Sequence, residues 1–168
     1  SMSGFAMAAE GVYGASVGAD GNVTKTEAFG SSNTVEITEE GIVVNATGVS
    51  LKNKDSVKAY GAFTNILNPN APTNLINSVF TGNSSENAGG GATIWADGNN
   101  TEVITNTISN SVFSGNSAAN KGGALAYLVM EAHEGQLLKV TDSSFTNNQA
   151  GTITDGKVTS SGTGGAIH

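Results

Sequence analysis

The chain has 168 residues, with 14 acidic and 7 basic side chains, so its formal net charge at pH 7 is −7. Gly, Asn, Ser and Thr together make 78 of the 168 residues (23, 19, 18 and 18), and only 12% of residues are charged. The length predicts one domain, and the composition argues against a helical protein. Because 38% of the residues are hydrophobic and the charge density is low, it also argues against intrinsic disorder.

The residue types that are missing exclude several functions. The chain has no cysteine, so disulfides and thiolate metal sites are excluded. It has no arginine and only seven scattered lysines, so nucleic acid is not an expected partner. The longest strongly apolar run, residues 124–130, is far shorter than the roughly 20 residues that span a bilayer, so no membrane insertion is expected in this segment.

The first part of the sequence is irregular. We interpret residues 1–3 as a remnant of an expression vector and residues 4–70 as an N-terminal cap with irregular early coils. Residues 17–23, centred on an Asp-Gly pair, predict a hairpin, and residues 60–63 resemble a degenerate Gly-Gly-Ala turn. A cap is expected because the end of a stacked sheet exposes unpaired backbone groups.

Residues 71–168 contain an internal repeat. Residues 77–90 align without gaps to residues 110–123, with 10 of 14 positions identical, and a weaker third copy starts at Asp142. The phenylalanines of the three copies are spaced by 33 and then 32 positions (113 − 80 and 145 − 113). The sequence ends where a fourth copy would begin, so we expect the repeats to be truncated at the C-terminus and to belong to a longer protein.

Each period contains three short strands separated by turn residues, with no amphipathic helix pattern. This predicts an all-β fold, a right-handed parallel β-helix of three-strand coils in which equivalent residues stack. We expect two interior columns, formed by the rings of Phe80, Phe113 and Phe145 and by the amides of Asn83, Asn116 and Asn148. Tight corners are predicted at the glycine pairs Gly90, Gly91, Gly122, Gly123, Gly164 and Gly165. A phosphate-binding glycine loop is the alternative for these pairs, but it would need a following helix.

Two positions are candidate ligand contacts. The third copy carries about ten extra residues, 151–162, whose Asp155-Gly156 pair predicts a projecting hairpin with a type I′ turn. Asp155 would then lie at a binding loop, although a solvated excursion without function is the simpler alternative. Trp95 is the single tryptophan; exposure would indicate a surface for stacking sugars, and burial a core-filling role.

The sequence offers little for catalysis. Asp97 and Glu131 are 34 positions apart, near one period, and would be the single candidate pair of carboxylates. Glu131, His133 and Glu134 could hold a metal loosely. Solvated turns explain both groups better, so no catalytic, cofactor or metal site is expected.

The Phe-x-x-Asn and Gly-Gly-Ala-Ile motifs resemble the repeats of polymorphic outer membrane proteins, which occur in passenger regions of bacterial autotransporters and related surface adhesins. The resemblance covers residues 77–168 and implies a position outside the cell, on an outer membrane-associated parent protein, with adhesion to host cells. The family is often cysteine-bearing in intracellular pathogens, and this chain differs in having none.

We therefore expect a non-catalytic structural or adhesive segment of a large, surface-exposed or secreted bacterial protein. The expected partner is a host-surface protein or glycan, and the open last coil predicts end-to-end self-association. The alternative is a polysaccharide-binding or polysaccharide-degrading protein on the same scaffold.

Overall fold

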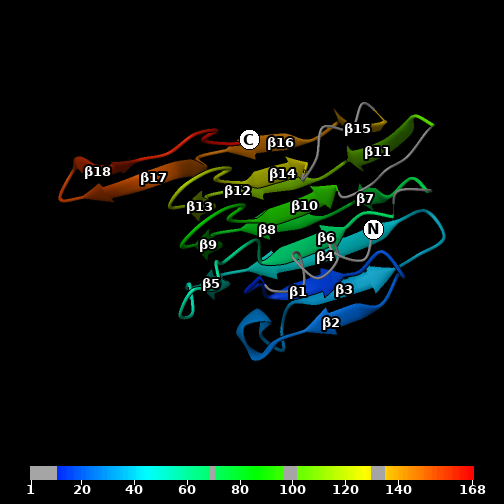
Figure 1. The fold of residues 1–168 in the computed structure, drawn as a ribbon, viewed down its shortest axis with the longest axis horizontal. Coiled ribbons are helices and arrows are strands. Elements are labelled where there is room, and N and C mark those ends of the chain that lie inside the picture. The colour runs from blue at the N-terminus through cyan, green and yellow to red at the C-terminus, as the bar shows by residue number, and fades with distance from the viewer. Residues whose placement is uncertain (1–10, 69–70, 97–101, 130–134) are drawn as a thin grey trace.

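The structure is a computed structural model that describes residues 11–68, 71–96, 102–129 and 135–168. The described chain is all-β, as predicted, and its one helical element is a short 3-10 turn, η1 (Glu27–Phe29). The strands form three sheets whose members are layered one above another (Figure 1). None of the described segments forms a helix long and apolar enough to cross a membrane.

The first sheet has the strand order β14-β10-β6-β1-β2. All of its neighbours are parallel except the β1–β2 hairpin at its edge. Its strands are β1 (Ala15–Val17), β2 (Val23–Lys25), β6 (Phe63–Ile66), β10 (Ala92–Ala96) and β14 (Leu125–Val129).

The second sheet is the largest. It has the order β15-β11-β7-β4-β8-β12-β16, because the long strand β4 pairs with β7 and with β8. The strand β3 lies antiparallel on β4. The members are β3 (Thr34–Ile37), β4 (Ile42–Thr47), β7 (Asn74–Ile76), β8 (Val79–Thr81), β11 (Ile104–Ser109), β12 (Val112–Ser114), β15 (Gln136–Thr141) and β16 (Ser144–Thr146).

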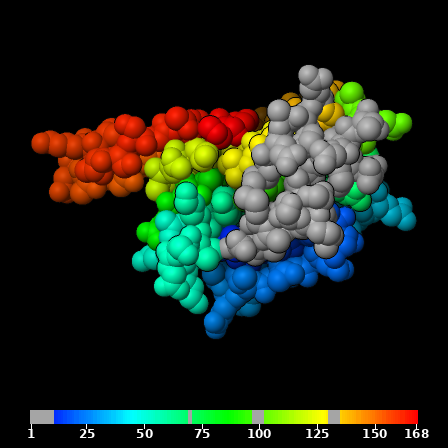
Figure 2. All heavy atoms as spheres, viewed as in Figure 1, coloured from blue at the N-terminus to red at the C-terminus, as the bar shows by residue number. Residues whose placement is uncertain are grey.

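The third sheet has the order β18-β17-β13-β9-β5, and its strands are β5 (Ser50–Leu51), β9 (Ser84–Ser85), β13 (Ser117–Ala118), β17 (Gln149–Thr154) and β18 (Lys157–Ser161). The first residues of β17 pair in parallel with β13, and its remainder forms an antiparallel hairpin with β18. That hairpin projects away from the layered sheets (Figures 1 and 2).

Along the chain, the strands visit the three sheets in a recurring order. In the best-conserved copies β8, β9 and β10 are followed by β12, β13 and β14, each paired in parallel with its counterpart. The register joins Phe80 to Phe113 and Phe113 to Phe145. The sequence period is therefore the step from one layer to the next.

The same three corners recur in each layer, and each places a residue in the left-handed region of φ. The short turns between consecutive strands of a layer require this conformation, which Gly, Asn and Asp adopt most readily. The equivalent residues are Asn77, Asn110 and Asp142 at the first corner; Gly82, Gly115 and Asn147 at the second; and Gly89, Gly122 and Gly164 at the third, with φ between 49° and 67°.

The N-terminal part is less regular than the repeats, but it belongs to the same sheets. The predicted hairpin is present, with Val17 paired to Val23 across β1 and β2. However, β1, β4 and β5 also pair in parallel with strands of later layers. The layered arrangement thus extends across residue 70, where the sequence predicts the regular repeats to begin.

Candidate functional site

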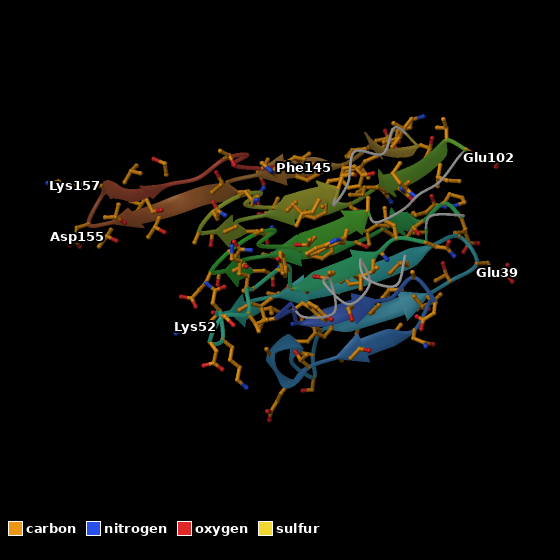
Figure 3. The ribbon with its side chains drawn as sticks, in the orientation of Figure 1. Glu39, Lys52, Glu102, Phe145, Asp155 and Lys157 are labelled. Atoms are coloured by element: carbon orange, nitrogen blue, oxygen red, sulfur yellow. The ribbon has the colours of Figure 1, made fainter. Side chains whose placement is uncertain are left out.

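The repeated phenylalanines form a continuous interior column. The ring centroids of Phe80 and Phe113 are 4.6 Å apart at an interplanar angle of 11°, and those of Phe113 and Phe145 are 4.6 Å apart at 7°. Phe80 and Phe113 are fully buried, and Phe145, labelled in Figure 3, is half-buried in the outermost layer. The parallel register places each ring directly over the next, so the phenylalanines that recur in the sequence form a stack of rings.

The asparagines three positions later form a second column. The Nδ2 of Asn83 donates to Oδ1 of Asn116 at 2.9 Å, and the Nδ2 of Asn116 donates to Oδ1 of Asn148 at 3.0 Å. Each Nδ2 also donates to a backbone carbonyl, as Asn116 does to Phe80 at 3.0 Å. Asn83 and Asn116 have no exposed surface, and a buried amide needs partners for both its donor and its acceptor.

A third column, of serines, was not predicted. The hydroxyls of Ser78 and Ser111 accept hydrogen bonds from the backbone N–H groups of Val44 and Ser78, at 2.9 and 3.1 Å. Ser143 continues the pattern by accepting from the N–H of Ser111 at 3.1 Å. The Asn-Ser pair that opens the identical stretch is the signal that could have revealed this column.

The strand register moves one predicted corner by a single position. Ala92 pairs with Leu125, so Gly91 lies beside Ala124 and is not the counterpart of Gly123. The left-handed corner residue is Gly89, at φ +59°, which the sequence interpretation missed. The first copy has three consecutive glycines, so the pair can be placed in either of two ways, and backbone pairing selects the first.

At Gly90 and Gly123, the second glycine of the pair is needed for close packing between layers. A Cβ on Gly90 would lie 2.2 Å from the carbonyl oxygen of Ser117, and one on Gly123 would lie 2.2 Å from that of Gly165. Both distances are far below van der Waals contact. Gly122 and Gly164 supply the left-handed conformation of this corner, and Gly90 and Gly123 leave room for the backbone of the next layer. Gly165, in the last layer, has no such crowding, because a Cβ there would lie 3.7 Å from the carbonyl oxygen of Asn148.

The extra residues of the third copy form the projecting hairpin. Its tip is Asp155-Gly156, both with positive φ (50° and 75°), and Figure 3 shows Asp155 and Lys157 at the far end of the molecule. Ile153 and Val158 pair across the hairpin and are 52% and 68% exposed. A groove of about 370 Å³ lies between this hairpin and the outer side of the third sheet.

Trp95 is buried, as in the second of the two alternatives, but not in the main core. It is only 3% exposed, yet it packs with Ile66 in a cluster separate from the main core, which contains its strand neighbours Ile94 and Ala96. Alternate residues of a strand point to opposite sides, so Trp95 is buried on the outer side of the first sheet. Its ring meets that of Tyr60 edge-on, with centroids 5.0 Å apart, and burial raises the pKa of the Tyr60 phenol.

A cavity of about 640 Å³ adjoins Trp95. Lys58 and Lys121 contribute to its lining, as do the amides of Asn87 and Asn120, and no carboxylate side chain of the described residues does. Two of the seven lysines therefore lie at one cavity in a chain whose net charge is −7.

The remaining candidates concern catalysis and metal binding. Asp97, Glu131, His133 and Glu134 lie outside the described residues. Within the described segments, no cluster of three or more His, Asp or Glu side chains could hold a metal ion. The ring of His168 contacts the hydroxyl of Thr163 at 3.2 Å.

The three stacked columns define an all-β protein built from repeats. A comparison with protein families matches residues 110–126 and 142–168 to the Chlamydia polymorphic membrane protein repeat. This match confirms the predicted resemblance, and it includes Phe113, Asn116, Phe145 and Asn148. A search of curated proteins and a search of solved structures found no match.

Proposed function

We propose that the three sheets wind as a right-handed parallel β-helix, with each layer forming one coil of three sides. The parallel pairing of equivalent residues 32 or 33 positions apart supports this winding, as do the recurring corners. Connections between parallel strands of one sheet are right-handed in about 98% of proteins, which supports the handedness.

We further propose that this β-helix is a non-catalytic structural and adhesive segment of a large bacterial surface protein of the autotransporter type. The repeat match to a family of Chlamydia membrane proteins supports an outer-membrane or surface location. Within the described repeats, the Phe, Asn and Ser columns are occupied by contacts between layers. Binding would then fall to the outer sides of the sheets and to the projecting loop.

The observation that carries the adhesive role is the β17–β18 hairpin. It extends beyond the layered sheets, exposes the apolar pair Ile153 and Val158, and borders the groove of about 370 Å³. Exposed apolar side chains at a projecting loop, next to a groove, are features of a protein-binding surface. The proposed partner of this loop is a host-surface protein.

A binding experiment tests this role. Fluorescently labelled protein is applied to cultured epithelial cells and to an array of host-surface proteins and glycans. A variant that deletes residues 153–154 and 157–159 keeps the Asp155-Gly156 turn but shortens the hairpin, and we expect it to lose most of the binding. Glu39 and Glu40 lie in a turn at the opposite end of the molecule (Figure 3 labels Glu39), so the double change to Gln is the matched control and should bind normally. Absence of binding by the unaltered protein, or full binding by the shortened variant, would contradict the role.

We also propose end-to-end association of two copies through the layer that contains β14, β15 and β16. These strands are the last of their sheets; residues 166–168 pair with the first part of β14, which leaves β15 and β16 as the open edges. Leu137 and Val129 in this layer are 48% and 41% exposed. Unpaired strand edges favour pairing with another chain. Sedimentation velocity should show dimers that disappear on a Leu137→Lys change; a strict monomer at high concentration would refute this proposal.

A further inference from the structure

The cavity beside Trp95 lies on the outer side of the first sheet. It is bounded by the segment containing Lys58 and Tyr60, by β10, and by the corner that leads into β14. Its volume of about 640 Å³ falls within the roughly 300–1,000 Å³ of small-molecule sites. None of the stacked columns that hold the layers together depends on filling it.

An aromatic cluster forms one wall. Tyr60 and Trp95 pack edge to face, and Ile66 and Leu128 extend this apolar cluster on β6 and β14. The indole Nε1 of Trp95 is buried and has no hydrogen-bond partner among the described residues. A buried N–H without an acceptor is costly, and because this atom is covered, a ligand in the cavity would meet it only after the surrounding side chains shift.

The lining also contains polar and cationic side chains. The Nδ2 of Asn120 donates to Oδ1 of Asn87 at 3.3 Å, and both amides line the cavity. Lys58 is exposed and Lys121 is half-buried at the same cavity. Two of the seven lysines thus line this space together with His168, and no described Asp or Glu side chain does.

We propose that this cavity binds an acidic saccharide, a pyranose that bears a carboxylate or a sulfate group. The C–H side of a sugar ring packs on aromatic carbon, its hydroxyls both donate and accept as asparagine amides do, and its anionic group matches the lysine ammonium groups. A purely apolar ligand would leave the amides and ammonium groups unpaired, and a neutral sugar would leave the lysines unpaired. The inference rests on the proposed adhesive function and assigns one class of partner to one site.

Trp95 is the single tryptophan, so the tryptophan fluorescence of the chain reports on this cavity. The purified chain is titrated with 3′-sialyllactose, with lactose 3′-sulfate and with lactose, while emission and its wavelength are recorded. We expect saturable changes with one or both acidic sugars, at affinities at least about tenfold above that for lactose. The two acidic arms distinguish carboxylate from sulfate recognition. Equal binding of lactose, or no saturable change with any of the three, would overturn the proposal.

Charge variants test the cationic side. Lys58→Gln and Lys121→Gln should each weaken binding of the acidic sugar by about tenfold, since a hydrogen bond to a charged group contributes roughly 1.5–3 kcal/mol. Lys52→Gln and Lys157→Gln remove the same charge from exposed positions that do not line the cavity, and should leave the affinity unchanged.

Comparison of the four lysine variants, and of cell binding with sugar binding, separates the possible outcomes. Equal losses in all four lysine variants would mean that net charge alone attracts the sugar, and would refute a site at the cavity. Binding to cells that depends on the hairpin but survives both Lys58→Gln and Lys121→Gln, without sugar binding in solution, would refute this inference and leave the adhesive role intact.

Discussion

Asn83 and Asn116 lie 33 positions apart in the chain, yet a 2.9 Å hydrogen bond joins their side-chain amides in a region that exposes neither of them to solvent. The Oδ1 of Asn116 also accepts from the backbone N–H of Asn83 at 3.1 Å. The Oδ1 of Asn116 therefore accepts hydrogen bonds from both the side chain and the backbone of Asn83 in the neighbouring layer. An aspartate of the same shape could accept these bonds but could not donate the two that Asn116 makes.

The first prediction concerns this amide. Asn116→Asp should lower the free energy of unfolding at pH 7 by about 3 kcal/mol or more, because it buries a charge and removes the two hydrogen bonds that the Asn116 Nδ2 donates, to the carbonyl of Phe80 and to Oδ1 of Asn148. Burial raises the pKa of a carboxyl group, so the loss should grow as the pH rises above about 4. Urea unfolding at several pH values measures it. Asn45→Asp, exposed on β4, is the control and should change stability by less than about 0.5 kcal/mol.

The second prediction concerns the phenylalanine column. Phe113 has a stacked ring on both sides, whereas Phe145 has one and is half-buried. Phe113→Ala should cost about 3–5 kcal/mol, and Phe145→Ala clearly less, since it opens a smaller cavity. Denaturant melts of the two variants give the comparison. Equal losses would show that the column does not act as a shared interior.

The third prediction separates backbone conformation from steric crowding. Gly115 and Gly122 have nearly the same φ, +67° and +64°, but a Cβ on Gly122 would lie 2.4 Å from the carbonyl oxygen of Leu125. Gly115→Ala should cost about 1–2 kcal/mol for the left-handed conformation alone, and Gly122→Ala considerably more. Gly115→Asn should be tolerated best, because Asn147 occupies the equivalent corner one layer on. Thermal unfolding ranks the three variants, and a Gly115→Asn protein less stable than Gly115→Ala would contradict the assignment.

The fourth prediction uses the tyrosines. Burial raises the pKa of Tyr60 and of Tyr127 above the ordinary value of 10.0. The unfolded chain therefore releases these protons at lower pH than the folded chain does, so stability should fall as the pH rises beyond about 10. Tyr60→Phe should make the fall shallower. Urea midpoints between pH 8 and pH 11 test this, and identical slopes for variant and unaltered protein would exclude a contribution from Tyr60.

Much of the layered fold could be predicted because the repeat carries its own register. Residues that contact their copies, such as Phe80 and Asn83, recur at the period, so sequence identity alone indicated the two columns. The gapless alignment also pairs Gly89 with Gly122, as the strands do, whereas the Gly-Gly-Ala motif alone favours Gly90 and Gly91. Local motif spacing was less informative there than the alignment of the whole copy.

The N-terminal strands and the Trp95 cavity could not be predicted in the same way. The segment of β1 and β4 has no close copy in the sequence, so nothing indicated that these strands would pair in parallel with the repeats. Tryptophan occurs in only one copy of the repeat, as Trp95. It packs against Tyr60, which comes from the layer before. A contact between unrelated positions of two layers leaves no trace in a self-comparison.

Gly151 marks the place where the two roles of β17 divide. Before it, Gln149 and Ala150 pair with β13; from Gly151 onward the strand pairs with β18. Peptides inserted at the hairpin tip should therefore leave the strand pairing between the layers unchanged. The layered sheets would then carry inserted peptides of different lengths.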